Sequence, residues 1–214
     1  MKKLILFLFT IAAFQSAEAQ TPFKSESIPL LIAKTSTDSV ACLERMTAYY
    51  FHIIINNYRK EKRLEPLNWN DTLWIAAKNH SLWMSNQDDL THSETANTPY
   101  FTGSGVGDRV LYASSGNKNL RWGAENAMYS SYVIGKDISA MALDFAKDAF
   151  EQWKGSPGHN QNMLKKNCRS HAVAFIIVPG TIWATDVFTF NGSENLTIEF
   201  PTSSIFKLKK LKVD

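Results

Sequence analysis

The stretch AFEQWKGSPGHNQNML, residues 149–164, joins an amphipathic helical pattern to a Ser-Pro-Gly turn and puts His159 directly after that turn. The turn fixes the backbone next to His159, so it can orient the imidazole ring toward a ligand. Ser, Pro and Gly are also the usual residues of a simple helix stop, and that interpretation stays open. Two further polar clusters favour a functional role: His92 in LTHSE and Glu125 in WGAENA.

The composition is that of one folded domain. Of the 214 residues, 44% are hydrophobic and 20% are charged, so the chain can bury a sizeable core and is not of the disordered class. The formal net charge is only +3. A nucleic-acid-binding protein concentrates basic residues on one face, so we expect no nucleic-acid partner.

The first 19 residues have the layout of a secretory signal peptide. Two lysines precede an apolar run from Leu4 to Phe14, and Ala17-Glu18-Ala19 is a small-x-small cleavage site. The run is short for a membrane span, so we expect an exported protein, extracellular or periplasmic, without such a span. An uncleaved membrane anchor is the alternative.

The rest of the chain divides into three parts. Residues 20–37 are rich in Ser, Thr and Pro and are expected to form an extended lead-in, residues 38–190 form the domain, and residues 191–214 form a C-terminal extension. Lysines alternate with apolar residues near the end of the extension. This pattern is typical of an added edge strand with a solvated lysine face, and a membrane-surface contact is the alternative.

The hydrophobic periodicity predicts helices mixed with a largely antiparallel sheet, which is an α+β fold. A helix begins at Asp38 or Ser39, and a second is capped by Asn70 or Asp71. The long segment 93–121 contains four glycines and is expected to be irregular. The other predicted elements are a helix at Ser139–Trp153 and two strands, Ala172–Val178 and Ile182–Phe190, joined by a Pro-Gly turn.

The chain has two cysteines, Cys42 and Cys168. In an exported protein they could form a disulfide that closes a long loop. Two buried free thiols are the equally weighted alternative, because the sequence does not give the distance between them.

Six segments, taken in order, resemble the CAP superfamily, which includes cysteine-rich secretory proteins, antigen 5 and pathogenesis-related one proteins. The resemblance runs from about Leu43 to Phe190 and is closest to the bacterial, SCP-like branch of extracellular domains. It implies a three-layer α-β-α sandwich around an antiparallel sheet, with a large open cleft. The segments are INNYRKEKRLEPLNWNDTLWIAAKNHSLWM, LTHS, GDRV, WGAENA, QWKGSPGHNQNML and TIWATDVFTF.

Many family members line that cleft with two histidines and two acidic residues. By this resemblance His92 and His159 match the two histidines, and Glu125 matches the glutamate of the family's Gly-Glu-Asn motif. This chain departs from the pattern twice. Ser156 stands where many eukaryotic members have the second glutamate, and Ala124 precedes Glu125 in place of glycine.

Two imidazoles and one carboxylate form an incomplete ligand set for zinc, with open positions for water or substrate. His92, His159 and Glu125 are thus candidate ligands of one divalent metal, and Glu125 and His159 are candidate catalytic groups, Glu125 as general base. No HExxH helix or GxSxG elbow supports catalysis. The alternative is that Glu125 only fixes a loop. The expected structural supports are Arg109, Asn126, Asn162 and the turn residue Ser156.

Two functional classes follow. The first is a secreted CAP-domain binding or interaction module whose cleft takes a lipid, sterol or glycan ligand, as the resemblance implies. The second is a zinc-dependent hydrolase with His92 and His159 as metal ligands and Glu125 as general base. A structural envelope protein with a degenerate cleft is a third possibility, so enzymatic activity is an open question at this point.

Overall fold

The computed structural model describes residues 39–132 and 138–190 of the chain. The signal peptide, the lead-in and the C-terminal extension that the sequence predicts lie outside these residues. The described helices are α2 (Ser39–Glu61), α3 (Asp71–Gln87), α4 (Val106–Ala113), α5 (Ile138–Gly155) and α6 (Pro157–Met163). The strands are β1 (Asn68–Trp69), β2 (Trp122–Ser131), β3 (Ser170–Val178) and β4 (Thr181–Thr189).

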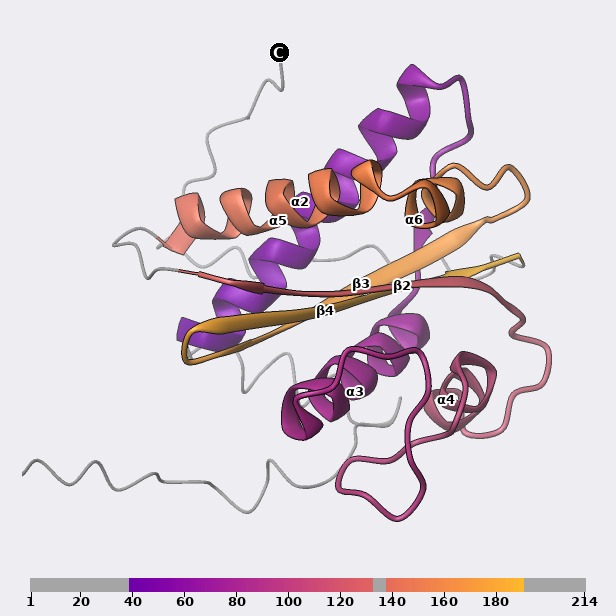
Figure 1. The fold of residues 1–214 in the computed structure, drawn as a ribbon. Coiled ribbons are helices and arrows are strands. Elements are labelled where there is room, and N and C mark those ends of the chain that lie inside the picture. The colour runs from indigo at the N-terminus through magenta and orange to yellow at the C-terminus, as the bar shows by residue number, and fades with distance from the viewer. Residues whose placement is uncertain (1–38, 133–137, 191–214) are drawn as a thin grey trace, which may run out of the picture.

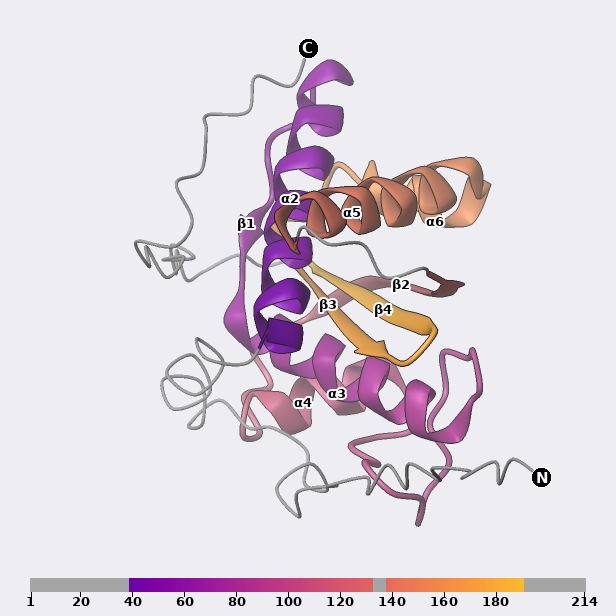
Figure 2. The same ribbon diagram turned by 90° about the vertical axis from the view of Figure 1, so that its left-hand side faces the viewer.

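The elements form three layers, as the resemblance implied. Figure 1 shows α2, α5 and α6 on one face of the sheet and α3 and α4 on the other, and the turned view in Figure 2 agrees. The strand order is β1-β3-β4-β2. All long strands pair antiparallel, and the short β1 pairs parallel with β3. The fold class is therefore the α+β sandwich with a central antiparallel sheet.

Several elements follow from local sequence. The N-cap residue of α3 is Asn70, whose side chain accepts a hydrogen bond from the backbone N–H of Leu73 at 3.1 Å. This cap satisfies one of the donors that a helix start leaves free. The hairpin between β3 and β4 turns at Gly180, whose φ of 86° is a conformation that glycine adopts without strain. The helix predicted at Ser139–Trp153 is also present, as α5.

Three elements differ from the sequence prediction. The segment 93–121 contains a helix, α4, so the prediction of an irregular segment was wrong there. The residues after Gly155 do not form a simple turn, because Ser156 is the N-cap of α6 and Pro157 occupies its first turn. Proline is favoured at that position, since its fixed φ fits a helix and its missing N–H would be unpaired anyway. No element was predicted at the WGAENA motif, which lies in a strand, β2.

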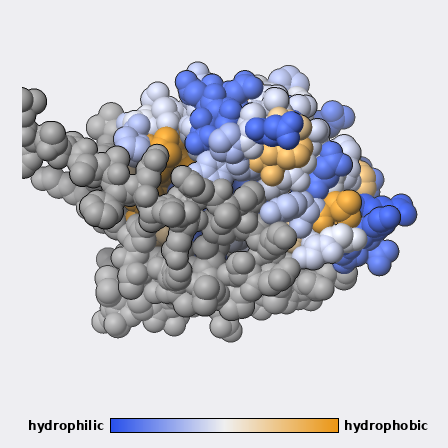
Figure 3. All heavy atoms as spheres, turned by 90° about the horizontal axis from the view of Figure 1, so that it is seen from below, coloured by the Kyte–Doolittle hydropathy of each residue, from blue (hydrophilic) through white to orange (hydrophobic). Residues whose placement is uncertain are grey.

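The core fills the space between the sheet and the helices on both faces. Phe51 of α2 meets Trp153 of α5 edge to face, with ring centroids 5.1 Å apart. A second apolar cluster lies under α3 around Trp83 and Trp183. Seen from below, the described surface is mainly hydrophilic with separate hydrophobic spots (Figure 3), which is the usual surface of a folded domain.

The two cysteines are free thiols in the structure. Cys42 lies near the start of α2 with its Sγ 3.9 Å from the sulfur of Met46, and Cys168 is buried before β3. The structure thus favours the alternative of two unpaired thiols over the disulfide. Among the described residues, no helix combines the length and the hydropathy that a membrane crossing requires.

Candidate functional site

Glu125 lies near the middle of β2 and is the centre of a buried ionic cluster. Its side chain is 4% exposed. The guanidinium Nη2 of Arg109 donates to both carboxylate oxygens, at 2.9 Å to Oε1 and 2.7 Å to Oε2. The Nδ1 atom of His92 lies 2.9 Å from Oε1. Two of the three predicted cleft residues, His92 and Glu125, are therefore in direct contact. Arg109 binds the carboxylate of Glu125 at the same time.

Arg109 also fixes the chain that carries His92. Its Nη1 and Nη2 atoms each donate to the backbone oxygen of His92 at 3.2 Å. The same guanidinium reaches the backbone oxygens of Gly103 and Ser104 at 3.5 and 3.4 Å. Since Arg109 belongs to α4, this helix braces the segment 92–104 against β2. Arg109 is one of the structural supports expected from the sequence, and these are the backbone contacts that it makes.

A second buried acid, Glu94, was not recognised in the sequence. Its Oε1 lies 3.0 Å from Nδ1 of His80, and its Oε2 accepts from the backbone N–H of Thr102 at 2.7 Å. His80 lies on the apolar side of the second predicted helix, a position that favours a packed core histidine. It is fully buried, yet its Nε2 also lies 2.9 Å from the backbone oxygen of Thr91 and 3.8 Å from Glu125 Oε1. A histidine on a buried helix face requires a polar partner, and this was the signal that could have found Glu94.

His159 reaches the site from the opposite layer, on α6. Two asparagines fasten this helix to β2: Asn126 Nδ2 donates to the His159 backbone oxygen at 3.2 Å, and Asn162 Nδ2 donates to the Glu125 backbone oxygen at 3.2 Å. Asn162 also donates to Asn126 Oδ1 at 2.9 Å. Asn126 and Asn162 are among the structural supports expected from the sequence, and these are the contacts that they make. Ser156 makes no side-chain cap bond, although it occupies the N-cap position of α6.

The electrostatics separate the roles of the three cleft residues. The hydrogen bond to Glu125 raises the pKa of His92 above its ordinary value of 6.5. Burial alone would raise the pKa of Glu125, but the hydrogen bond from His92 and the charge of Arg109 outweigh it and lower the pKa. Burial and then repulsion from His92 lower the pKa of His159. These shifts favour the protonated form of His92, the neutral form of His159 and the ionised form of Glu125.

The donor set fits a metal only in part. Within residues 39–132 and 138–190, no three His, Cys, Asp or Glu side chains are placed to hold a metal ion. Both oxygens of Glu125 are engaged by Arg109, and Nδ1 of His92 is engaged by Glu125. The groups that could hold a metal are Nε2 of His92 and the ring of His159, which would leave Glu125 as a hydrogen-bonding support of a ligand.

A second titratable cluster lies between α2 and the sheet. His171 Nδ1 is 2.9 Å from Asp186 Oδ1, and His171 Nε2 is 2.8 Å from His52 Nδ1. The stacked rings of the two histidines have centroids 5.0 Å apart. The sequence allows two interpretations of Asp186, an acidic group near the end of the sheet or an exposed strand residue. Asp186 is completely buried, so the second interpretation is wrong. Burial raises the pKa of Asp186.

His52 is expected to make the protein less stable in acid. Burial, and then the charge of His171, lower the pKa of His52 to about 3 from 6.5. Below pH 6.5 the unfolded chain takes up a proton that the folded chain refuses, so the free energy of unfolding falls with pH down to about pH 3. One such group lowers the free energy of unfolding by about 2 kcal/mol between pH 6.5 and pH 5. Denaturant unfolding at several pH values should show this slope.

The control for this prediction is His52→Gln, compared with the parent at each pH. Between pH 4 and pH 6, the free energy of unfolding of the variant should depend less steeply on pH than that of the parent. The difference in slope should correspond to about one proton. The raised pKa of Asp186 makes the protein more stable in acid, and the lowered pKa of His159 makes it less stable. Both residues are present in the parent and the variant, so their contributions cancel in the comparison. Parallel pH curves for the two proteins would show that His52 titrates normally in the folded state.

Two solved structures are similar in fold. An extracellular protein with an SCP domain from Bacillus anthracis superposes with a TM-score of 0.50 at 16% identity, and the match covers 69% of this chain and 41% of that chain. This chain thus spans less than half of the length of the Bacillus protein. An outer surface protein from Borrelia burgdorferi matches with a TM-score of 0.48 at 14% identity, over 66% of this chain and 90% of that chain.

No curated protein sequence matches this chain significantly. The family model of the CAP, or cysteine-rich secretory protein, family does match, over residues 53–184. These residues include β2 with Glu125, the helix α4 with Arg109, and both cleft histidines, and they make up more than half of the chain. The chain therefore belongs to the CAP, cysteine-rich secretory protein, family.

Proposed function

We propose that this CAP domain is a secreted binding module, and that its cleft of His92, Glu125 and His159 holds an anionic oxygen of a lipid or glycan ligand. The observation that carries the proposal is that both oxygens of the Glu125 carboxylate are engaged. Both accept from Arg109, and Oε1 also contacts His92. A general base needs a pKa near the working pH, and the pKa of Glu125 is lowered instead.

The same contacts suit a binding role for His92. Its side chain is 58% exposed, and its Nδ1 faces Glu125, so Nε2 is the ring nitrogen left for a ligand. A protonated imidazole donates a charge-assisted hydrogen bond, which is stronger than a neutral one. His159 lies close enough to His92 to feel its charge and supplies a second, neutral ring. An anionic oxygen between the two rings would receive one charged and one neutral contact.

Binding should therefore weaken as the pH rises. Because the pKa of His92 is raised, its positive charge persists above pH 6.5 and is lost as the pH passes the raised value. We expect the purified mature protein to bind phosphatidylglycerol vesicles or an acidic polysaccharide more tightly at pH 6 than at pH 8.5. Phosphatidylcholine vesicles and a neutral polysaccharide are the matched probes without the anionic group. Co-sedimentation and calorimetry measure the two cases.

Variants locate the binding in the cleft. His92→Gln should weaken binding about tenfold to a hundredfold, which corresponds to one charged hydrogen bond of about 1.5–3 kcal/mol. Lys118→Ala removes a positive charge from an exposed position outside the cleft and should change the affinity by less than twofold. Equal losses in the two variants would mean that general charge attraction, and not the cleft, holds the ligand.

Metal analysis separates this proposal from the zinc-hydrolase alternative. Elemental analysis should be run on the same preparation from which lipids are extracted for mass spectrometry. About one zinc per chain that is lost in His159→Ala, together with a hydrolytic turnover that is also lost, would overturn the binding proposal. Ligand binding that survives treatment with a chelator would support it.

A further inference from the structure

The outer edge of β2 is half covered and half open. β2 is the last strand in the order β1-β3-β4-β2, and no described strand pairs with its outer side. In its first half, three backbone oxygens that point away from β4 accept hydrogen bonds from side chains. The pairs are Gly123 with Lys165 Nζ at 3.1 Å, Glu125 with Asn162 Nδ2 at 3.2 Å, and Ala127 with Trp153 Nε1 at 3.3 Å.

The second half of this edge lacks such a cover. Backbone direction alternates along a strand, and the register with β4 is unbroken from Ala124 to Ser131, so Tyr129 and Ser131 also point their N–H and C=O groups outward. Apart from a local bond of Ser130 Oγ to the Ser131 oxygen at 3.3 Å, no described group bonds to these outward atoms. An exposed row of this kind is a template for another strand.

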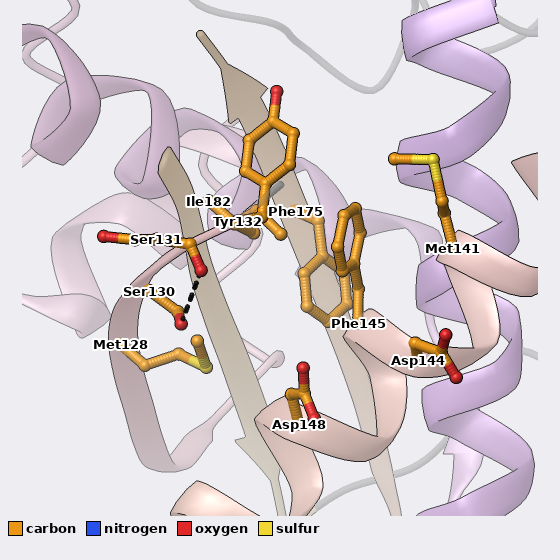
Figure 4. Close-up of a pocket in the computed structure, with 10 residues that line it drawn as sticks. All are labelled: Met128, Ser130, Ser131, Tyr132, Met141, Asp144, Phe145, Asp148, Phe175 and Ile182. Carbon is orange, nitrogen blue, oxygen red and sulfur yellow. Dashed lines mark hydrogen bonds between the residues drawn. The ribbon is translucent and has the colours of Figure 1, made fainter. Parts of the chain in front are cut away.

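A cavity lies beside the open half on the α5 face of the sheet. It has a volume of about 330 Å³ and lies between β2, the β3–β4 hairpin and α5. Its walls include the rings of Phe145, Phe175 and Tyr132 and the thioether of Met128. Figure 4 shows these side chains between β2 and α5. The cavity can thus receive an apolar side chain from a strand that runs along β2.

Two carboxylates border the same cavity. Asp144 and Asp148 lie one turn apart on α5, and both are exposed. In Figure 4 the carboxylate of Asp148 lies between Met128 and Phe145. Neither aspartate forms an ion pair with any of the described residues, in contrast to Glu151 on the same helix, which pairs with Lys154 at 3.3 Å. The border of the cavity therefore carries two negative charges that a basic side chain can neutralise.

The opposite face of the open edge presents an aromatic ring. Tyr129 is 49% exposed, although it belongs to a strand of the central sheet. Its ring stacks on the buried Trp183 of β4, with centroids 5.2 Å apart and an interplanar angle of 25°. A strand placed on the edge would cover this ring with the side chains of its other face.

We propose that the edge of β2 at Tyr129 and Ser131 binds an extended peptide segment of a partner protein, antiparallel to β2, with an apolar side chain in the cavity and a Lys or Arg side chain beside Asp144 and Asp148. Strand addition of this kind takes its affinity from backbone hydrogen bonds and its specificity from pockets for alternate side chains. The open backbone favours a peptide over a small cation, which would use only the carboxylates. This surface is separate from the histidine cleft.

The geometry dictates the probe. In an antiparallel pair, residues whose N–H groups face β2 place their side chains on the Tyr129 face, and the intervening residues place theirs on the cavity face. A capped Thr-Val-Thr-Lys-Thr-Lys-Thr peptide thus aims valine and lysine at the cavity and its carboxylates. N-methylation of its two central threonine nitrogens should abolish binding in calorimetry. Methylation of the valine and first lysine nitrogens, which face solvent, should leave binding within about threefold.

Charge is tested on both partners. Asp144→Asn combined with Asp148→Asn in the protein should weaken binding about twofold to thirtyfold, because two exposed pairs are lost. Replacing the two lysines of the peptide with glutamate should weaken binding at least as much, because it also places like charges together. Glu151→Gln is the matched control on the same helix. Equal binding of both methylated peptides, binding lost only with methylation of the solvent-facing nitrogens, or no binding of the parent peptide at millimolar concentration would each overturn the proposal. Thermal unfolding verifies that every variant is folded.

Discussion

Arg109→Met is expected to lower the free energy of unfolding by about 3–5 kcal/mol. The guanidinium is 1% exposed and gives two hydrogen bonds to Glu125, so its removal leaves a buried carboxylate without its main partner. It also deprives the backbone oxygen of His92 of two donors. Breaking a buried ion pair from one side costs more than the pair itself contributes, since the remaining charge is desolvated and unpaired. Urea unfolding followed by fluorescence measures the loss.

Two variants separate charge from shape at this position. Arg109→Met combined with Glu125→Met removes both charges and should recover a large part of the lost stability. Arg169→Met, at an exposed arginine, should change the free energy of unfolding by less than about 0.5 kcal/mol. If Arg109→Met and Arg169→Met unfold at the same urea concentration, Arg109 has no structural role in the cluster.

Trp153→Ala is the second substitution with a large expected effect, also about 3–5 kcal/mol. Trp153 is 0% exposed and is one of the largest fully buried side chains, so alanine leaves a cavity that a packed core fills only in part. The substitution also removes the edge-to-face contact with Phe51 and the hydrogen bond to the Ala127 oxygen at 3.3 Å. Calorimetric melting and urea unfolding should agree on the loss.

Trp153→Phe isolates the hydrogen bond from the ring. It keeps an aromatic side chain beside Phe51 but leaves the Ala127 oxygen without its donor, so we expect a smaller loss of about 1–3 kcal/mol. Trp122→Ala serves as the surface control, because Trp122 is 48% exposed, and should cost less than either core variant. A surface variant as damaging as Trp153→Ala would contradict the assignment of Trp153 to the core.

The elements that the sequence predicted correctly are those with local causes. Asn70 caps α3 because its own side chain reaches a backbone N–H three residues on. The β3–β4 hairpin follows from two apolar runs on either side of Gly180. The positive φ of this glycine suits a tight turn. Neither case needs information from a distant part of the chain.

β2 was missed for the opposite reason. Glu125 and Asn126 look like loop residues, because strands avoid buried polar side chains that lack partners. Their partners come from distant segments: Arg109 for the Glu125 carboxylate and Asn162 for the Asn126 side chain. Hydrophobic periodicity records only which residues are apolar, so it cannot show that a polar residue is satisfied by another layer of the fold.

The residues of the candidate site likewise fall into two groups, those that sequence motifs indicated and those that only tertiary contacts explain. His92, Glu125 and His159 were named from a resemblance of motifs, and the structure places His92 on Glu125 and His159 close to His92. Glu94 was not recognised and His80 was interpreted as a packed core residue, because their contact joins side chains 14 residues apart in the sequence. The grip of Arg109 on both Glu125 oxygens, which decides whether that carboxylate can act as a base, depends on the packing of α4 against β2 and is likewise a tertiary property.

The two cleft histidines come from opposite layers, yet both are tied to the single strand β2, one through Glu125 and the other through Asn126. The position of each ring therefore depends on contacts with β2 as well as on the segment or helix that carries the histidine. A substitution at Glu125 or Asn126 in β2 would therefore remove a contact of a histidine that comes from another layer of the fold.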